Sequence, residues 1–327
     1  MKLAEKIFSI PLVKLVWYRL NRTFSSRKFQ IPYTRKNPRY MIWGDGSREN
    51  TKQPVPKIIW SYWSGKKSAC AEACRNTWET HKSDFTILIL NSDTIRNFLP
   101  DIPQLPDSIP EQKVSNLIRL MLLERYGGIW VDYSTFLTQP LNWVIDLIEK
   151  NNCEVLAFYN EFPDEYKTNH ERPIIENGFL TAATGSKFIS EWRRTYQECI
   201  LSKNYKEFFR ERDDFNILTS NFLRKDKNYI DYFVCYIAAQ LVMTRPKPYR
   251  LILINAEDEY YYLSYSLNPP RSRRKFCKEM LLRSKRNHGY SRLVKITGRH
   301  RKAIDEHIAY GCYRQDSMIG FQLYDSV

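Results

Sequence analysis

A carboxylate that follows a short apolar segment is the group in this sequence best placed to do chemistry. Asp132 comes directly after residues 129–131, which in turn follow the pair Gly127-Gly128. Upstream, the polar sequence SNLIR at 115–119 opens a stretch with helical periodicity. In α/β enzymes, strand-end carboxylates beside polar helix residues hold a nucleotide and its metal ion. The pattern therefore predicts a nucleotide site at Asp132.

Alternating strands and helices must position these residues. Short apolar runs predict strands, whereas longer stretches with a broad apolar face predict helices. Proline marks the loops, and glycine ends the helix before Asp132. The alternation predicts an α/β fold with a mostly parallel central sheet flanked by helices. The predicted strands are 57–63, 85–90, 129–131, 155–159 and 176–183, and the predicted helices are 69–82, 111–126, 143–149 and 186–202.

The composition divides the chain into three parts. Residues 1–53 form a basic, amphipathic N-terminal segment whose second half reads as an irregular arm, and residues 54–270 form the compact domain. Residues 203–270 are the hardest part of that domain to interpret. Residues 271–327 form a basic C-terminal segment that packs on or extends the domain.

Four landmarks together resemble a known family. They are PKIIWSYW, SNLIRLMLLERYGGIWVDYS, ENGFLTAATG and LVKITG, in that order along the chain. The series resembles the capsular polysaccharide synthesis proteins, within the glycosyltransferases that have a DXD-type sugar-binding region. The resemblance implies a GT-A-like nucleotide-diphospho-sugar transferase fold. It also implies a nucleotide-sugar donor and a glycan acceptor, expected to be lipid-linked.

The resemblance gives Asp132 the role of the first aspartate of the DXD element, holding the ribose and a divalent cation, Mn²⁺ or Mg²⁺. Such a cation would neutralise the charge that builds on the departing diphosphate. Ser134 stands where the second acid is expected, so the metal would bind weakly, through Ser134 and water, or take another ligand. The pair Gly127-Gly128 precedes the strand, and the lack of a side chain at Gly128 would let the diphosphate approach closely.

A second departure lies at the start of the helix. The family usually has Ser-Asp-x-x-Arg, whereas this chain has Asn116 in place of the aspartate. Asn116 and Arg119 share a helix face because they are three residues apart. Asn116 can still bond a ribose or base without charge. Arg119 would touch the donor or pair with Asp132, and a structural ion pair is an equal alternative.

Two further residues are candidates for binding the nucleotide. Trp60 matches the aromatic residue that the family places against the base, although a core tryptophan is an equally good interpretation. Asn91 follows the second predicted strand and would line the same site. Its position at a helix start also explains it as a capping residue.

The last candidates concern the acceptor side and the diphosphate. Asn177 lies in ENGFLTAA, which resembles the acceptor-side strand, and Glu176 beside it would act as the base if the reaction inverts. Glu161 and Asp164, on a polar loop, are weaker alternatives. Lys295 in LVKITG matches a C-terminal landmark and would meet the diphosphate.

Charge and cysteine content indicate where such a protein works. The net charge of +15 is concentrated in residues 1–40 and 271–302, which suits an anionic partner such as a membrane surface. Aromatic residues and lysines in the first 20 residues favour an in-plane membrane segment over a helix packed on the domain. The seven scattered cysteines predict reduced thiols. We expect a protein at the inner face of a bacterial plasma membrane.

Two other functions explain part of the sequence. A basic protein that binds membranes or nucleic acid accounts for the charge but not for the GGIWVDYS block, and no nucleic-acid motif is present, so no nucleic-acid partner is expected. A catalytically silent relative accounts for the missing second acid.

Overall fold

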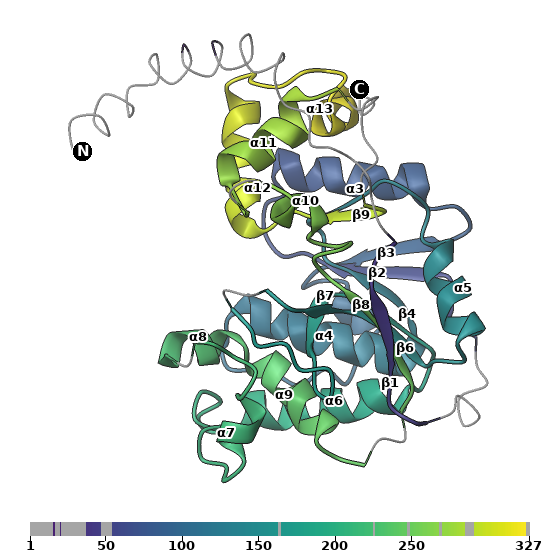
Figure 1. Cartoon of the computed structure of the whole chain (residues 1–327), viewed down its shortest axis with the longest axis vertical. Helices are drawn as coiled ribbons and strands as arrows, with labels where there is room; N and C mark the ends of the chain where they lie inside the picture. The colour runs from purple at the N-terminus through teal and green to yellow at the C-terminus, as the bar shows by residue number, and fades with distance from the viewer. Residues whose placement is uncertain are drawn as a thin grey trace, which may run out of the picture.

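A seven-stranded sheet forms the centre of the molecule (Figure 1). The computed structural model describes residues 16, 20, 37–46, 54–162, 165–224, 226–246, 249–267, 270–284 and 291–324. In spatial order the strands are β1 (Tyr40–Trp43), β8 (Leu251–Asn255), β6 (Val155–Asn160), β7 (Ile174–Ala182), β4 (Gly128–Val131), β2 (Ile58–Tyr62) and β3 (Thr86–Leu90).

The sheet is mixed but mostly parallel. Strand β2 is parallel to β3 and β4, and β6 is parallel to β8. Strand β7 is antiparallel to both β4 and β6, and the edge strand β1 is antiparallel to β8. Five strands (β2, β3, β4, β6 and β8) therefore run the same way. The predicted α/β class with a mostly parallel sheet is confirmed.

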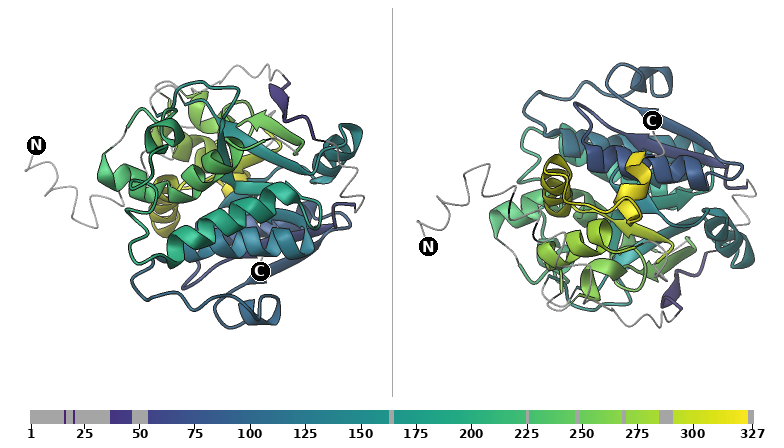
Figure 2. Two further views of the ribbon diagram at one scale, coloured as in Figure 1. Left: turned by 90° about the horizontal axis from the view of Figure 1, so that it is seen from below. Right: turned by 90° about the horizontal axis from the view of Figure 1, so that it is seen from above.

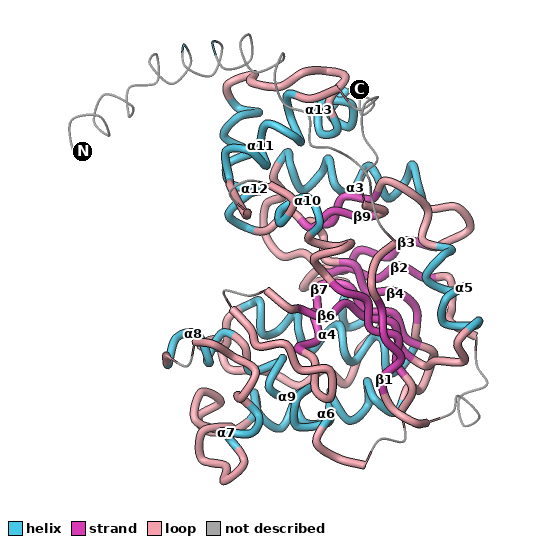
Figure 3. Tube along the Cα trace, in the orientation of Figure 1, coloured by secondary structure: helices cyan, strands magenta, loops and turns pink. Residues whose placement is uncertain are grey.

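Helices cover both faces of this sheet (Figures 1 and 3). Helices α4 (Glu111–Tyr126), α6 (Lys187–Leu201) and α9 (Val234–Met243) lie on one side, and α3 (Ala69–His81) lies on the other. Strands β6, β7 and β8 are buried along their whole length, as expected for strands covered on both faces. The remaining short elements are η2 (Ile95–Asn97), α5 (Asn142–Lys150), α7 (Phe215–Leu218) and α8 (Lys227–Tyr232).

The C-terminal part packs around α3 (Figure 2). It contains α10 (Tyr262–Tyr265), α11 (Arg273–Leu282), β9 (Leu293–Lys295), α12 (Gly298–Ala309) and α13 (Met318–Tyr324). Strand β9 pairs antiparallel with β5 (Thr135–Leu137), just after β4 in the chain. Phe136, Phe276, Val294 and Ile304 share a second apolar cluster there. The basic C-terminal segment thus reaches the neighbourhood of Asp132.

The sheet begins earlier in the chain than predicted. Strand β1 lies within the segment expected to be an irregular arm, and its partner β8 lies in the part of the chain that was hardest to interpret. The predicted N-terminal membrane segment, apart from Val16 and Leu20, lies outside the described residues. Among the helices described, none combines the length and apolar character needed to cross a membrane. The seven cysteines are buried free thiols, as predicted.

Candidate active site

Strand pairing fixes Asp132 at the end of β4. Val131 is the last residue of the strand, opposite Phe179 of β7. The Asp132 backbone N–H continues the ladder by donating to the carbonyl oxygen of Gly178, 2.9 Å away. The Asp132 side chain is 26% exposed, so it remains accessible from solvent. The predicted strand-end carboxylate is therefore present and accessible.

Both oxygens of the Asp132 carboxylate have cationic partners. The Lys295 ammonium lies 2.5 Å from Oδ2, and the Arg119 guanidinium lies 3.3 Å from Oδ1. The indole N–H of Trp130 also donates to Oδ1, at 2.9 Å. Burial by itself would raise the pKa of the Asp132 carboxyl, but Lys295 and Arg119 outweigh it and hold the pKa below its usual value. Asp132 is therefore ionised at neutral pH.

Strand β9 carries Lys295 to this position. Lys295 is the register partner of Thr135 in β5, three residues after Asp132. The N–H of Ile296 donates to the carbonyl oxygen of Ser134 at 3.0 Å, which extends the pairing. The Lys295 side chain is only 10% exposed. A residue far from Asp132 in sequence is thus fixed beside it by backbone hydrogen bonds.

Helix α4 supplies Arg119 and Asn116, as its spacing predicts. Arg119 donates to the carbonyl oxygen of Asn177 at 2.5 Å and lies over the Trp130 ring, 4.8 Å from the ring centroid. Asn116 accepts a hydrogen bond from the Asn177 amide at 3.2 Å. Arg119 is almost fully buried (side chain 5% exposed) and pairs with Asp132, which fits the ion-pair interpretation. It positions Asp132 and braces the β7 backbone.

Glu176 is held by four hydrogen-bond donors. The Gly178 N–H and the Tyr236 hydroxyl donate to Oε1 at 3.0 and 3.1 Å. The Asn160 amide and the Tyr261 hydroxyl donate to Oε2, both at 3.3 Å. Burial and the nearby Glu176 charge raise the pKa of Tyr236 and Tyr261 well above the usual value, so both remain protonated donors.

Gly178 brings the two carboxylates together. A Cβ atom at this position would lie 2.9 Å from Asp132 Oδ2 and 3.1 Å from Glu176 Oε1. The two acids therefore face each other across a residue that has no side chain. The structure thus gathers Asp132, Glu176, Asn177, Asn116, Arg119 and Lys295 into one site.

Trp60 and Gly128 do not belong to this site. Trp60 is 1% exposed, donates to the Gly127 carbonyl oxygen at 2.8 Å and packs on Phe98 and Tyr126. The expected contact with a nucleotide base is therefore wrong for this conformation, and the core interpretation holds. Gly128 has a φ of 96°, and a Cβ there would lie 2.7 Å from the Ile58 carbonyl oxygen. Close packing of β4 on β2 explains this glycine, rather than approach of a diphosphate.

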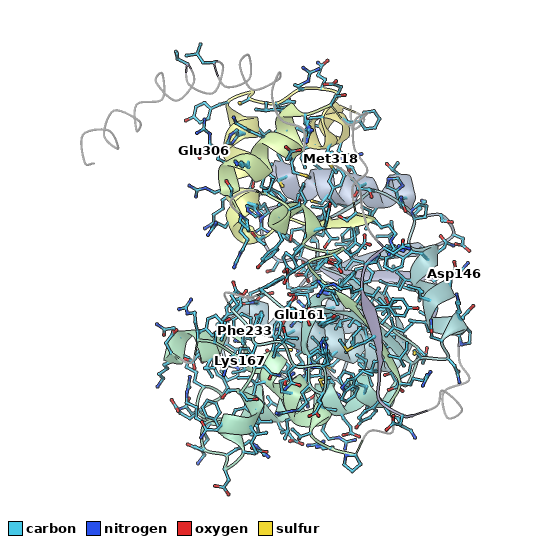
Figure 4. The ribbon with its side chains drawn as sticks, viewed as in Figure 1. Asp146, Glu161, Lys167, Phe233, Glu306 and Met318 are labelled. Atoms are coloured by element: carbon cyan, nitrogen blue, oxygen red, sulfur yellow. The ribbon has the colours of Figure 1, made fainter. Side chains whose placement is uncertain are left out.

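Asn91 acts as a local cap. Its side-chain oxygen accepts hydrogen bonds from the backbone N–H groups of Asp93 and Thr94, at 2.9 and 3.0 Å. The capping interpretation accounts for it fully. Of the weaker alternatives to Glu176, Glu161 instead pairs with Arg39 and accepts from Asn255, and it is labelled in Figure 4. Asp164 lies outside the described residues.

The donor set around Asp132 does not fit a divalent cation well. Mg²⁺ and Mn²⁺ prefer several oxygen ligands, usually with more than one carboxylate. The Asp132 oxygens are already bonded to Lys295, Arg119 and Trp130, and Ser134 offers one neutral hydroxyl. Within the described part of the chain, no group of three His, Cys, Asp or Glu residues could hold a metal. Two cations occupy the place expected for the ion.

Sequence reasoning did not identify Trp130, Gly178, Tyr236 or Tyr261. Trp130 could have been identified from its spacing. It lies two residues before Asp132, and residues two apart along a strand point to the same face. Gly178 stands beside the candidates Glu176 and Asn177, where a glycine inside a strand marks close approach. The two tyrosines come from a region with no clear pattern.

Comparison with known proteins identifies the family of this chain. The sequence profile of the family described as capsular polysaccharide synthesis protein matches residues 23–284. The chain belongs to this family. The resemblance seen in the sequence is therefore confirmed, and the matched range includes Asp132 and Glu176 but ends before Lys295.

Individual relatives are more distant. An O-glycosyltransferase, braB, of Annulohypoxylon truncatum is 27% identical over 175 residues, which are 45% of this chain and 39% of that protein. The chain thus spans about two fifths of the length of this relative. Among solved structures, a glycosyltransferase involved in glycosylation of the major capsid of PBCV-1 has 14% identity and a TM-score of 0.40, covering 78% of this chain and 99% of that one. GlyE of Streptococcus pneumoniae has 11% identity and a TM-score of 0.41, covering 84% and 64%.

Proposed function

We propose that this protein is a glycosyltransferase that moves a sugar from a nucleotide-diphosphate donor to a hydroxyl group of a glycan. The observation that supports it most is the cluster of Asp132, Arg119 and Lys295 at the end of β4, in a member of the capsular polysaccharide synthesis family. The finer expectations remain proposals: a lipid-linked capsular or cell-surface acceptor and association with the inner face of a bacterial plasma membrane.

In this proposal, each charged residue has a separate task. When the bond between the anomeric carbon and the diphosphate breaks, its electron pair moves to the leaving oxygen. Lys295 is the cation best placed to meet that charge, whereas Arg119 stays bonded to Asn177 and Asp132. Asp132 holds the lysine in place and faces the ribose.

Glu176 is the base that we propose for an inverting reaction. The acceptor hydroxyl would attack the anomeric carbon while its proton passes to the Glu176 carboxylate. Both carboxylate oxygens are already engaged, so the acceptor must displace one of the present donors, such as Asn160 at 3.3 Å. Asn177 positions the strand beneath this carboxylate through its bonds to Asn116 and Arg119.

Replacement of Asp132 tests the proposal. With a panel of nucleotide sugars, we expect the native protein to release nucleoside diphosphate, and Asp132→Asn to lower the release rate roughly 100-fold by loosening Lys295. Asp132→Asn keeps hydrogen bonding to Arg119 and Trp130 and should fold normally. Release of free nucleoside diphosphate is the measurement, with an unfolding curve for each variant as the control.

The outcomes separate the alternatives. Equal turnover by both proteins would refute the assignment of Asp132. Nucleotide binding without turnover by the native protein would indicate a silent relative. Salt-sensitive binding to a DNA duplex without nucleotide binding would indicate a basic binding protein.

A further inference from the structure

A large cavity opens beside Glu176. Its volume is about 590 Å³, within the range typical of ligand sites. Asn160 at the end of β6, Glu176 of β7 and Thr297 before α12 contribute to its wall, together with residues of α8 and α9. Phe233, between those two helices, also lines it and is labelled in Figure 4. Glu176 thus lines the cavity, whereas Asp132 and Lys295 do not.

Aromatic side chains form much of the wall. Eight Phe or Tyr residues line the cavity, and Phe162 stacks on Tyr265 with ring centroids 4.4 Å apart. Tyr232 is 51% exposed, so its ring is open to a ligand. Flat rings pack against the C–H faces of sugar rings, and tyrosine adds a hydroxyl that can bond a sugar hydroxyl. This wall suits a saccharide better than an aliphatic chain.

Buried polar atoms without a hydrogen-bond partner among the described residues line the cavity. They include Oδ1 of Asn160 and Oγ of Ser264, in residues that are 3% and 2% exposed. Leaving such groups unsatisfied in the interior costs free energy, so native structures normally pair them. A ligand rich in hydroxyl groups would satisfy both.

One positive charge at the cavity is not balanced by an ion pair. Two of its three arginines have acidic partners: Arg224 pairs with Asp226 at 3.0 Å, and Arg271 pairs with Glu165. The exposed Arg299 donates to a backbone carbonyl at 3.2 Å and forms no ion pair with any residue described here. It lies in the first turn of α12, whose N-cap residue makes no side-chain capping bond. A helix start beside a guanidinium that has no acidic partner attracts an anion.

We propose that this cavity is the acceptor site and that the acceptor is an acidic saccharide, bearing a carboxylate or a phosphate group. The proposal rests on the glycosyltransferase function and adds the chemistry of the acceptor. Arg299 and the start of α12 bind the acidic group at the exposed side. The rings hold the sugar, and Asn160 and Ser264 bond its hydroxyl groups. The reacting hydroxyl group then lies at the buried side, against Glu176.

Binding of simple glycosides to the full chain tests this site. We would titrate a nitrophenyl glucuronide, a hexose phosphate and a nitrophenyl glucoside by calorimetry, without donor. The acidic ligands should bind at least tenfold more tightly than the neutral glucoside. Arg299→Gln should remove that preference and leave the glucoside unchanged, whereas Tyr232→Ala should weaken all three. Arg194→Gln, an exposed arginine of α6 outside the cavity, is the matched control.

Every outcome bears on the proposal. Stronger binding of the glucuronide than of the hexose phosphate would identify a carboxylate, and the reverse would identify a phosphate. Equal binding of acidic and neutral ligands, no binding at all, or a preference that survives Arg299→Gln would overturn it. Donor hydrolysis without acceptor is measured in parallel. Hydrolysis with no saccharide binding rejects the acceptor site alone, whereas saccharide binding with no hydrolysis rejects the transferase function.

Discussion

Gly178 leaves room for the two acids of the site because it has no side chain. Because a Cβ there would lie 2.9 to 3.1 Å from Asp132, Tyr260 and Glu176, Gly178→Ala must push at least one of them aside. Small displacements of catalytic groups can cost on the order of 100-fold in rate. We expect a loss of that size in turnover with a cooperative unfolding transition retained. Near-native turnover would mean that the two carboxylates need no fixed separation.

Lys295 makes a second residue-scale prediction. If this ammonium neutralises the diphosphate, Lys295→Met should lower turnover roughly 100-fold, and Lys295→Arg should recover part of it. EDTA should reduce the native rate much less than the methionine substitution does. Loss of native activity in EDTA, restored by Mn²⁺, would contradict this and favour the cation expected from the resemblance. Rates of nucleoside diphosphate release with saturating donor are the measurement.

At the residue scale, local sequence pattern could bring together only some of the residues that cluster around Asp132. Asp132, Arg119 and Asn116 could be found because a strand end and a helix face each bring neighbours in sequence together. The pairing of Asp132 with Lys295 could not, since 163 residues separate them. Trp60 could not be assigned either, because an aromatic residue in a strand looks the same whether it faces a ligand or the core.

At the scale of elements, β9 shows why the C-terminal segment was hard to place. Three residues, Leu293–Lys295, are too short for a reliable periodic signal, and basic residues surround them. Their role depends on pairing with β5, which only the tertiary fold reveals. Strands β2 to β4 and helices α3 and α4 were predictable because their apolar patterns are regular. Strands β1 and β8 were missed because each lies beside irregular chain.

Helix α4 is tied to α8 by a buried lysine, which gives a pH prediction. Lys113 is 3% exposed and donates to the carbonyl oxygens of Asp231 and Tyr232, at 2.6 and 2.8 Å. Burial lowers its pKa from 10.5 to about 8. Between those pH values the unfolded chain binds more protons than the folded one, so this lysine makes the protein more stable as pH rises.

Comparison with Lys113→Met isolates the effect. From pH 8 to pH 10, the free energy of unfolding of the native protein should rise relative to that of the variant, by roughly 2 kcal/mol. Chemical denaturation at several pH values measures both. A difference that stays constant over this range would show that the amine is not desolvated in the folded state.

Over the whole molecule, the net charge is unevenly distributed along the chain. The positive residues are concentrated in residues 1–40 and 271–302, whereas the rest of the chain is mildly acidic. Basic segments gain about 1 kcal/mol per lysine or arginine at an anionic surface. We expect the full chain to float with vesicles that contain phosphatidylglycerol. Salt at 0.5 M should release it, because salt screens the attraction and the Debye length is already only about 10 Å at 0.1 M.

A chain that lacks residues 1–36 should lose most of this flotation while still releasing nucleoside diphosphate. Vesicles of phosphatidylcholine alone are the control, and they should not carry the protein. Equal flotation with neutral vesicles would point to apolar insertion instead of charge. If flotation does not depend on the first 36 residues, the basic C-terminal segment must bind the anionic vesicles instead.

The glycine pair before Asp132 serves the contact between two strands, with Trp60 bonded to the Gly127 carbonyl oxygen. A descendant that had abandoned catalysis would still need that contact to fold. The sequence GGIWV alone is therefore weak evidence of activity in distant relatives. An aspartate directly after it, together with a lysine in the short strand near the C-terminus, is the combination that should distinguish active enzymes from inactive relatives.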